Sequence, residues 1–353
     1  MMLLPVSSAR AGDIVSKNNF TFYGDNTEFF EPYRTRETLL GQQAENELEI
    51  GLGPTAFLSG GVFWDFRSTS VQDPDVTVKP LLSFEYKMGG TRLILGTLDV
   101  ENRHGFLEPM EVTFLEFTRP IEYGFQWIEQ DPSFHADLFL NWQQLNDPSQ
   151  PESFDYGGVV NQALTDRLSV ELQYHGYHQG GKLYFIDVYN NWVPGLGLRL
   201  DLPEFLGRTQ LAAFGLVSSQ LAGGTLSQME WGQGLYLNAT VTPVQNFDLF
   251  GIGWVGSNFY SQEGDANYMS YSDPYSFTVD DPHPFVQSNR TYFEAGLRKI
   301  FPIEGGSTFT TELRSHWIDE YWAFSFRLWA TVPLDLFLGN VNFRPRSSNE
   351  PVN

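Results

Sequence analysis

The sequence predicts an all-β protein, an antiparallel up-and-down transmembrane β-barrel of about 14 strands, with roughly 12 to 16 as the range. Three observations predict it. Apolar and polar residues alternate with a period of two along many stretches, and Gly and Pro repeatedly interrupt helical patterns. No apolar run approaches the ~18 residues of a membrane-spanning helix. If this chain crosses a membrane, it therefore does so with strands.

The clearest alternation covers residues 134–143, where Leu138, Leu140 and Trp142 share one face and Asp137 and Asn141 the other. Short turn clusters such as Met88-Gly89-Gly90 alternate with long polar connections such as residues 260–289, which is typical of a membrane barrel. If each strand with its connection takes roughly 20 residues, residues 46–337 hold about 14 strands. Further strands are predicted at residues 46–52, 61–67, 79–87, 92–98, 112–117, 121–129, 154–161, 170–175, 192–200, 210–217, 235–242, 248–255, 291–298, 308–316 and 323–332.

The composition excludes several classes of protein. Asp and Glu number 43 against 21 Lys and Arg, a net charge of -22, which argues against nucleic acid as a partner because phosphate binding needs clustered cations. The absence of Cys excludes disulfide scaffolds, thiolate metal sites and Cys nucleophiles. Aromatic residues make up 16% of the chain, which suits the belts where a barrel meets the lipid headgroups.

The ends of the chain are read separately from the barrel. Ala9-Arg10-Ala11 has the small-x-small form of a signal-peptidase site, so we interpret residues 1–11 as the remnant of a secretory signal, with an ordinary N-terminus as the alternative. Residues 12–45 are predicted to be a polar N-terminal segment, residues 46–337 the barrel and residues 338–353 a C-terminal tail. A last strand at residues 334–343 is the alternative for the tail.

On the Ala9-Arg10-Ala11 site, the alternating strands and the aromatic-rich residues 321–332, the chain resembles Gram-negative outer-membrane β-barrels of porin-like size. The chain departs from their pattern because it ends on Asn353 and not on an aromatic residue. The resemblance implies a place in the bacterial outer membrane, in contact with its lipid and with lipopolysaccharide. Its protein partner would be either further copies of the same chain, in a homo-oligomer, or another protein of the cell envelope.

The polar faces of the predicted strands carry charges of both signs, and we expect them to line the lumen. A hydrated lumen of this kind predicts a passive or weakly selective channel for small hydrophilic solutes, with cations or neutral sugars favoured. Loops that fold inward would cover part of it. The expected lumen-facing residues are His135, Asp137, Asn141, Glu171, Gln173, His175, Glu294, Arg298, Glu312, Arg314 and Arg327.

The sequence gives no catalytic residues, so we expect no enzyme and no cofactor. Asp73-Pro74-Asp75 and Asp281-Pro282-His283 loosely resemble the acidic and Asp-His pairs of omptin-type outer-membrane proteases, which leaves an outer-membrane hydrolase as an alternative. Two further alternatives are an anchoring barrel of an envelope assembly and a secreted soluble carbohydrate-binding protein.

Metal binding is also considered and not adopted. His175 and His178 are three residues apart, so on a strand they point to opposite faces and cannot share an ion. Acidic side chains gather in one long loop and could bind Ca²⁺, with a solvated acidic surface as the simpler interpretation. These loop residues are Asp265, Asp273, Asp280 and Asp281.

Overall fold

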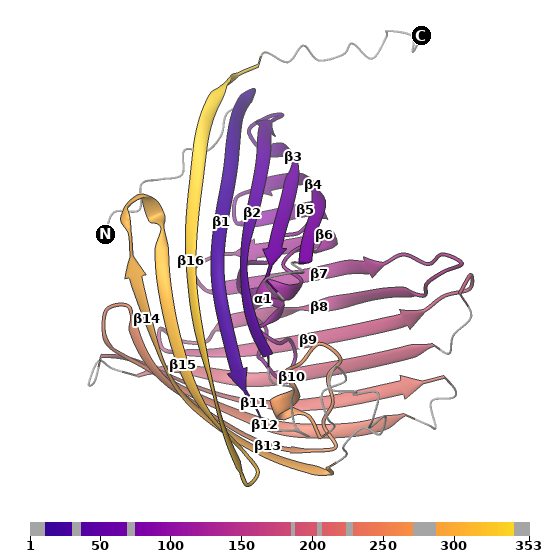
Figure 1. Cartoon of the computed structure of the whole chain (residues 1–353), viewed down its shortest axis with the longest axis vertical. Coiled ribbons are helices and arrows are strands. Elements are labelled where there is room, and N and C mark those ends of the chain that lie inside the picture. The colour runs from indigo at the N-terminus through magenta and orange to yellow at the C-terminus, as the bar shows by residue number, and fades with distance from the viewer. Residues whose placement is uncertain are drawn as a thin grey trace.

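The computed structural model describes residues 11–29, 37–68, 75–184, 188–202, 207–223, 229–270 and 287–341. Sixteen antiparallel strands form one closed barrel, which β1 (Asp13–Glu28) and β16 (Tyr321–Asn340) close by pairing with each other (Figure 1). The predicted all-β barrel is confirmed, with sixteen strands instead of about 14. Among the described residues, no helix is long and apolar enough to cross a membrane.

The other elements follow in chain order around the barrel. They are β2 (Glu37–Gly51), β3 (Ala56–Arg67), β4 (Asp75–Met88), β5 (Thr91–Thr97), η1 (Glu101–Gly105), α1 (Leu115–Thr118), β6 (Tyr123–Gln130), β7 (Phe134–Gln144), β8 (Glu152–Ala163), β9 (Leu168–Gly180), β10 (Tyr189–Leu202), β11 (Arg208–Ala222), β12 (Glu230–Val244), β13 (Phe247–Ser257), η3 (Ala266–Tyr268), β14 (Asn289–Pro302), η4 (Glu304–Gly306) and β15 (Thr308–Ile318).

The two ends of the barrel differ in their connections. Strand β1 begins and strand β16 ends at the same rim of the barrel. The connections at this rim are short, such as residues 89–90 and 245–246. Gly89 and Asn246 adopt positive φ angles of 63° and 62° there, as tight hairpin turns require. The longest connections, residues 98–122 and 258–288, start at the other rim. Because short turns mark the periplasmic side of such barrels, this second rim is the outer end.

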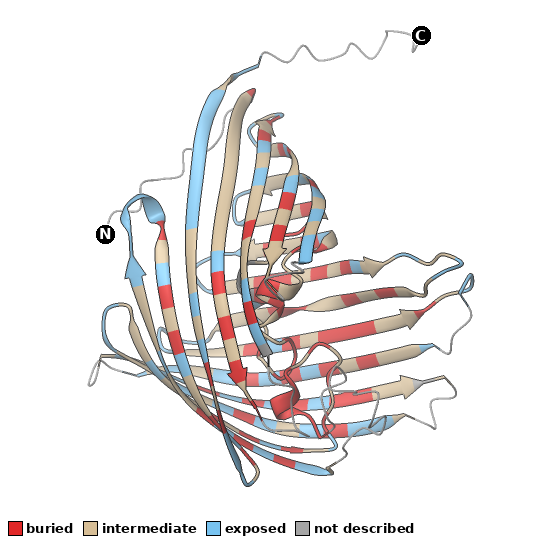
Figure 2. Cartoon of the chain, viewed as in Figure 1, coloured by how far each residue is buried: buried red, intermediate tan, exposed pale blue. Residues whose placement is uncertain are grey.

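The alternation seen in the sequence places apolar side chains on the outside of the barrel. On β12, Leu235 and Leu237 are 49% and 47% exposed, while Tyr236 between them points inward and is 5% exposed. Figure 2 shows this exchange of buried and exposed residues along most strands. Only every second strand residue needs to face lipid, which explains how a mean hydropathy of -0.27 suits a membrane protein.

The predicted boundaries of the barrel need correction. Residues 12–45 are not a separate polar segment, because β1 and most of β2 lie within them. They escaped detection because polar residues such as Ser16, Asn18 and Gln42 occupy the outward row as well. At the other end β16 continues without a break to Asn340, so no separate strand starts at residue 334. Residues 1–10 and 342–353 lie outside the described part of the chain.

Residues 98–122, which we call the inner segment, fold into the lumen. The main chain of Phe117 accepts hydrogen bonds from Gln43 on β2 and Arg67 on β3. On the opposite wall, Glu108 forms an ion pair of 2.7 Å with Arg314 on β15. A segment that contacts strands all around the wall must lie inside it. The strand predicted at residues 112–117 is therefore wrong: its last three residues belong to α1, whose Leu115 and Phe117 are buried inside the lumen.

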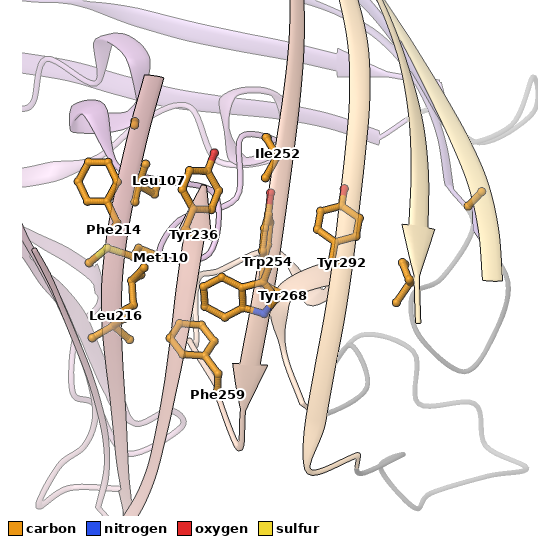
Figure 3. Close-up of a cluster of buried hydrophobic side chains, with 14 of the residues drawn as sticks. Leu107, Met110, Phe214, Leu216, Tyr236, Ile252, Trp254, Phe259, Tyr268 and Tyr292 are labelled. Atoms are coloured by element: carbon orange, nitrogen blue, oxygen red, sulfur yellow. The ribbon is translucent and has the colours of Figure 1, made fainter. Parts of the chain in front are cut away.

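An apolar core fills part of the lumen between the inner segment and the wall (Figure 3). Phe214 and Trp254, which point inward from β11 and β13, are 0% and 1% exposed. Met110 of the inner segment and Phe259 and Tyr268 of residues 258–270 pack against them. This core is packed like the interior of a soluble protein, although it lies inside a membrane barrel. It reduces the part of the lumen that is open to solutes.

Candidate functional site

Three neighbouring strands bring Glu294, His316 and Ser325 together on the lumen side near the outer end. Glu294 on β14 is paired directly with His316 on β15 in the strand register. Ser325 on β16 is the diagonal neighbour of His316, because it pairs with Arg314 two residues away. His316 lies two residues before the end of β15 at Ile318, so the cluster is close to the outer rim.

The polar atoms of these side chains form a connected chain. The Ser325 hydroxyl oxygen is 2.8 Å from His316 Nε2. On the other side of the ring, His316 Nδ1 is 2.7 Å from the Tyr292 hydroxyl and 3.3 Å from Glu294 Oε2. The Tyr292 hydroxyl in turn donates to Glu294 Oε2 at 2.5 Å. A hydroxyl, an imidazole and a carboxylate are therefore linked in sequence.

The surroundings fix this chain in place. Arg314 bonds to Glu294 Oε1 at 3.1 Å and also contacts Glu108 and Glu312. The ring of Phe29, at the end of β1, lies 4.8 Å from the His316 ring. Ser325, His316 and Glu294 are 7%, 3% and 1% exposed. Little water reaches the group, so its hydrogen bonds are strong and its geometry is well defined.

This arrangement has the parts that a serine nucleophile needs. The imidazole can take the hydroxyl proton, and the carboxylate orients the imidazole and balances its charge. The roles follow from geometry and do not depend on sequence order or fold. Acyl transfer from an ester is the chemistry that such a group performs.

A second buried cluster, of ion pairs around Arg103 and His104, holds the inner segment in place. His104 lies between Glu122 and Asp137, at 3.1 Å and 3.0 Å, and Arg103 forms ion pairs with Glu122 and Glu111. Burial alone would lower the pKa of His104, but the hydrogen bonds from the two carboxylates raise this pKa to about 10. A histidine that keeps its proton cannot act as a base, so this cluster is an anchor for the inner segment.

The lumen-facing residues expected from the sequence all lie on the inner side, and most are paired. Glu171 binds Arg199 at 2.7 Å, and Gln173 accepts from the main chain of Leu107 at 3.1 Å. His175 is fully buried, with Nε2 3.5 Å from Asp155. The remaining pairs are Asp137 with His104, Asn141 with Asp155, Glu312 with Arg298 and Arg314, Glu294 with Arg314, and Arg327 with Asp25, while His135 is half-buried.

The loop residues considered for other chemistry do not form a described site. Asp73, Asp273, Asp280, Asp281 and His283 lie outside the described residues. Asp265 caps η3 by accepting from the main chain of Asn267. Within the described ranges, His, Cys, Asp and Glu side chains form no group of three or more that could hold a metal ion.

Sequence reasoning missed the Ser325, His316 and Tyr292 group. Ser325 stands on the polar face of the strand predicted at residues 323–332, and His316 ends the one predicted at residues 308–316. The missing signal was the register between strands, because only the register shows that these two side chains are diagonal neighbours.

Comparison with solved structures supports the barrel. OmpTdeltaL8, a loop deletion mutant of the Vibrio cholerae outer membrane protein OmpT, gives a TM-score of 0.57 at 8% identity, covering 92% of this chain and 100% of that one. OccK3 (OpdO) from Pseudomonas aeruginosa gives 0.51 at 11% identity, covering 92% and 96%. At such identities the likeness concerns the fold. Together with the closed barrel it places the protein in the bacterial outer membrane, which excludes the secreted soluble alternative.

Comparison with curated proteins gives no significant match. A family model described as Lipid A 3'-O-deacylase-type matches residues 6–341, nearly the whole chain. This match overturns the expectation that the protein is not an enzyme. That expectation rested on the absence of linear catalytic motifs in the sequence. The chain belongs to the Lipid A 3'-O-deacylase-type family.

Proposed function

We propose that the protein is an outer-membrane ester hydrolase that removes an acyl chain from the lipid anchor of lipopolysaccharide. The observation that carries the proposal is the 2.8 Å contact between the Ser325 hydroxyl and His316 Nε2, backed by Glu294. The family description names lipid A as the substrate of its type member and ester deacylation as the reaction. Both point to the same chemistry.

In the proposed reaction, the Ser325 hydroxyl oxygen attacks the ester carbonyl while its proton passes to His316 Nε2. The bond between the carbonyl carbon and the sugar oxygen then breaks, and that oxygen takes the proton from His316. The acyl group is left on Ser325. Water repeats the same path, giving its proton to His316 and releasing the fatty acid and the free serine. Glu294 keeps the imidazole oriented and offsets its charge throughout.

The position of the group supports a lipid substrate from the outer leaflet. His316 and Ser325 lie near the outer rim, next to the short β15–β16 connection at residues 319–320. On the lipid side at this height, Trp317 and Trp322 are 39% and 51% exposed. Aromatic residues of this kind sit at the level of lipid headgroups. An ester just below the headgroup would therefore lie at the depth of the site.

The proposal is tested by analysing the lipid A of cells that produce the barrel. Mass spectra of lipid A from cells producing the wild-type chain should show a species that lacks one acyl chain, and Ser325→Ala should abolish it. Ser315→Ala is the matched control, because Ser315 is on β15 next to His316 but accepts a hydrogen bond from Trp322. Loss of an acyl chain that persists in Ser325→Ala would disprove the assigned nucleophile.

A passive channel is the second candidate, and one observation favours it. A cavity of about 550 Å³ lies between the inner segment and β1 to β5 and is lined by charged residues such as Lys17, Glu45, Glu47 and Arg92. A hydrated cavity with both charge signs suits small polar solutes. The inner segment and the apolar core stand against it, because they fill part of the lumen.

A further inference from the structure

A second cavity lies in the lumen, between residues 106–108 of the inner segment and the wall formed by β10 and β12 to β15. Its volume is about 250 Å³. Two lining residues locate it along the barrel: Asp248 is the second residue of β13, and Arg199 lies three residues before the end of β10. Both positions are near the rim with the short turns. The cavity therefore lies on the periplasmic side, away from the polar cluster at the outer end.

The charges around this cavity are already balanced. Each of its three guanidiniums binds a carboxylate: Arg199 pairs with Glu171, Arg298 with Glu312 and Arg314 with Glu108. The Nη1 groups of Arg199 and Arg298 make no hydrogen bond to the described residues, and these side chains are 41% and 38% exposed, so water reaches them. Since Glu108 and Asp248 also line the cavity, an anion gains no net attraction, and a cation meets three guanidiniums. The cavity therefore suits a neutral ligand that both donates and accepts hydrogen bonds.

The side chain of Tyr236 brings an unused hydroxyl to the cavity wall. Tyr236 is 5% exposed, and its hydroxyl makes no hydrogen bond to any described residue. A buried hydroxyl without a partner is costly, because it loses its hydrogen bonds to water on folding. The ring packs in the apolar core, and in Figure 3 the hydroxyl lies on the side of the ring away from Phe259. The hydroxyl is therefore a fixed donor and acceptor for a ligand in the cavity.

Phe250 gives the cavity a flat apolar face. It pairs with Gly296 on β14, where an added Cβ would lie 2.3 Å from Cζ of the Phe250 ring. Only glycine leaves room for the ring to lie against the wall. The guanidiniums of Arg298 and Arg314 lie 5.8 Å and 5.4 Å from the ring centre and hold the ring in this position. The face turned away from the wall carries partial negative charge, which attracts weakly positive C–H groups.

We propose that this cavity binds a neutral sugar from the periplasm, one pyranose ring at a time. The C–H groups of such a ring suit the face of Phe250. Its hydroxyls donate and accept, which suits Tyr236, Asn238 and the guanidinium N–H groups. The volume is below the ~300 Å³ at which pockets for drug-sized ligands begin, so a longer sugar chain would not fit. The site does not depend on the proposed ester hydrolysis, which would take place at the other end of the lumen.

The test measures the binding of three monosaccharides to the purified full-length barrel, in a detergent without a sugar headgroup. Glucose, glucuronate and glucosamine share one ring type and differ in charge. Saturation-transfer NMR gives each Kd, and heat-modifiable gel migration confirms folding. Tyr236→Phe removes the unused hydroxyl, and Phe250→Leu removes the aromatic face. Tyr177→Phe is the matched control, because Tyr177 is a buried tyrosine on β9 that does not line this cavity.

We expect glucose to bind with a Kd on the order of 1–10 mM, and both charged sugars to bind several-fold more weakly. Tyr236→Phe and Phe250→Leu should each weaken glucose binding about 3- to 10-fold, and Tyr177→Phe should leave it unchanged. The absence of saturable glucose binding would overturn the proposal, as would tighter binding of a charged sugar or an equal Kd in wild type and Tyr236→Phe. Deacylation of lipid A bears only on the proposed function, so the two ideas can fail separately.

Discussion

The Ser325 hydroxyl lies 2.8 Å from His316 Nε2 although the two residues belong to different strands and are not register partners. The contact is diagonal across β15 and β16, and it exists because both side chains point into the lumen near the outer rim. Strand backbones hold both residues rigidly, which gives a defined geometry without a loop. A barrel wall can therefore hold a hydroxyl, an imidazole and a carboxylate in contact while the sheet stays intact.

Replacing His316 with Gln should remove the base and keep the fold. Gln cannot accept and return a proton, so labelling of Ser325 by a fluorophosphonate should fall by about 10² to 10⁴-fold. His175→Gln is the control, since His175 is equally buried in the lumen and contacts Asp155 instead. Equal labelling rates in wild type and His316→Gln would show that His316 is not the base.

Replacing Arg314 with Met should destabilise the barrel strongly. Arg314 is 11% exposed and contacts Glu108, Glu294 and Glu312, so its loss leaves buried carboxylates without a cation, at a cost of about 3–5 kcal/mol. We expect a much smaller loss, about 0–1 kcal/mol, for Arg199→Met. Arg199 is 41% exposed, and its partner Glu171 keeps hydrogen bonds from Asn161 and Gln173.

Urea unfolding in detergent, followed by tryptophan fluorescence, measures both changes. Similar midpoints for the two variants would contradict the picture of Arg314 as the cation that holds this part of the wall together.

The anchor of the inner segment should respond to pH in a defined window. The pKa of His104 rises from its ordinary 6.5 to about 10 in the fold, so its stabilising effect is complete below pH 6.5 and is lost as the pH rises through 10. Arg103 and His104 lower the pKa of Glu122 to about 2 against the opposing effect of burial, so its contribution is present above about pH 4.5 and lost toward pH 2.

Limited proteolysis of the folded barrel reports on this anchor. Cleavage within residues 98–122 should be slow at neutral pH and faster above pH 10. His104→Gln cannot be protonated, so it should be cleaved readily at both pH values. A wild-type cleavage rate that stays constant from pH 6 to pH 11 would argue against a charged His104.

The inner segment should also limit conductance. Together with the apolar core it fills part of the lumen, so the wild-type barrel should conduct weakly in planar bilayers. Replacing residues 99–121 with a short Gly-Ser linker should raise the conductance several-fold. The same replacement of residues 146–150, in the connection between β7 and β8, serves as the control. A large wild-type conductance that this deletion does not change would instead support the channel function.

Much of the fold could be predicted from the sequence because a barrel wall imposes a simple rule. Side chains alternate between lipid and lumen, so apolar rows such as Leu235 and Leu237 mark strands by themselves. The rule fails where the outward row turns polar, which hid β1 and part of β2. It also fails where an apolar stretch packs inside the lumen, as α1 does.

The sequence by itself determined the fold class, the membrane location and the absence of cysteine chemistry, because these depend on composition and on a local period of two. Only the tertiary structure decided what the lumen contains and which polar residues meet. Ser325, His316, Tyr292 and Glu294 become neighbours through the register of three strands. A shift of one residue in that register would turn every side chain of a strand to the other face, so alternation alone cannot reveal the site.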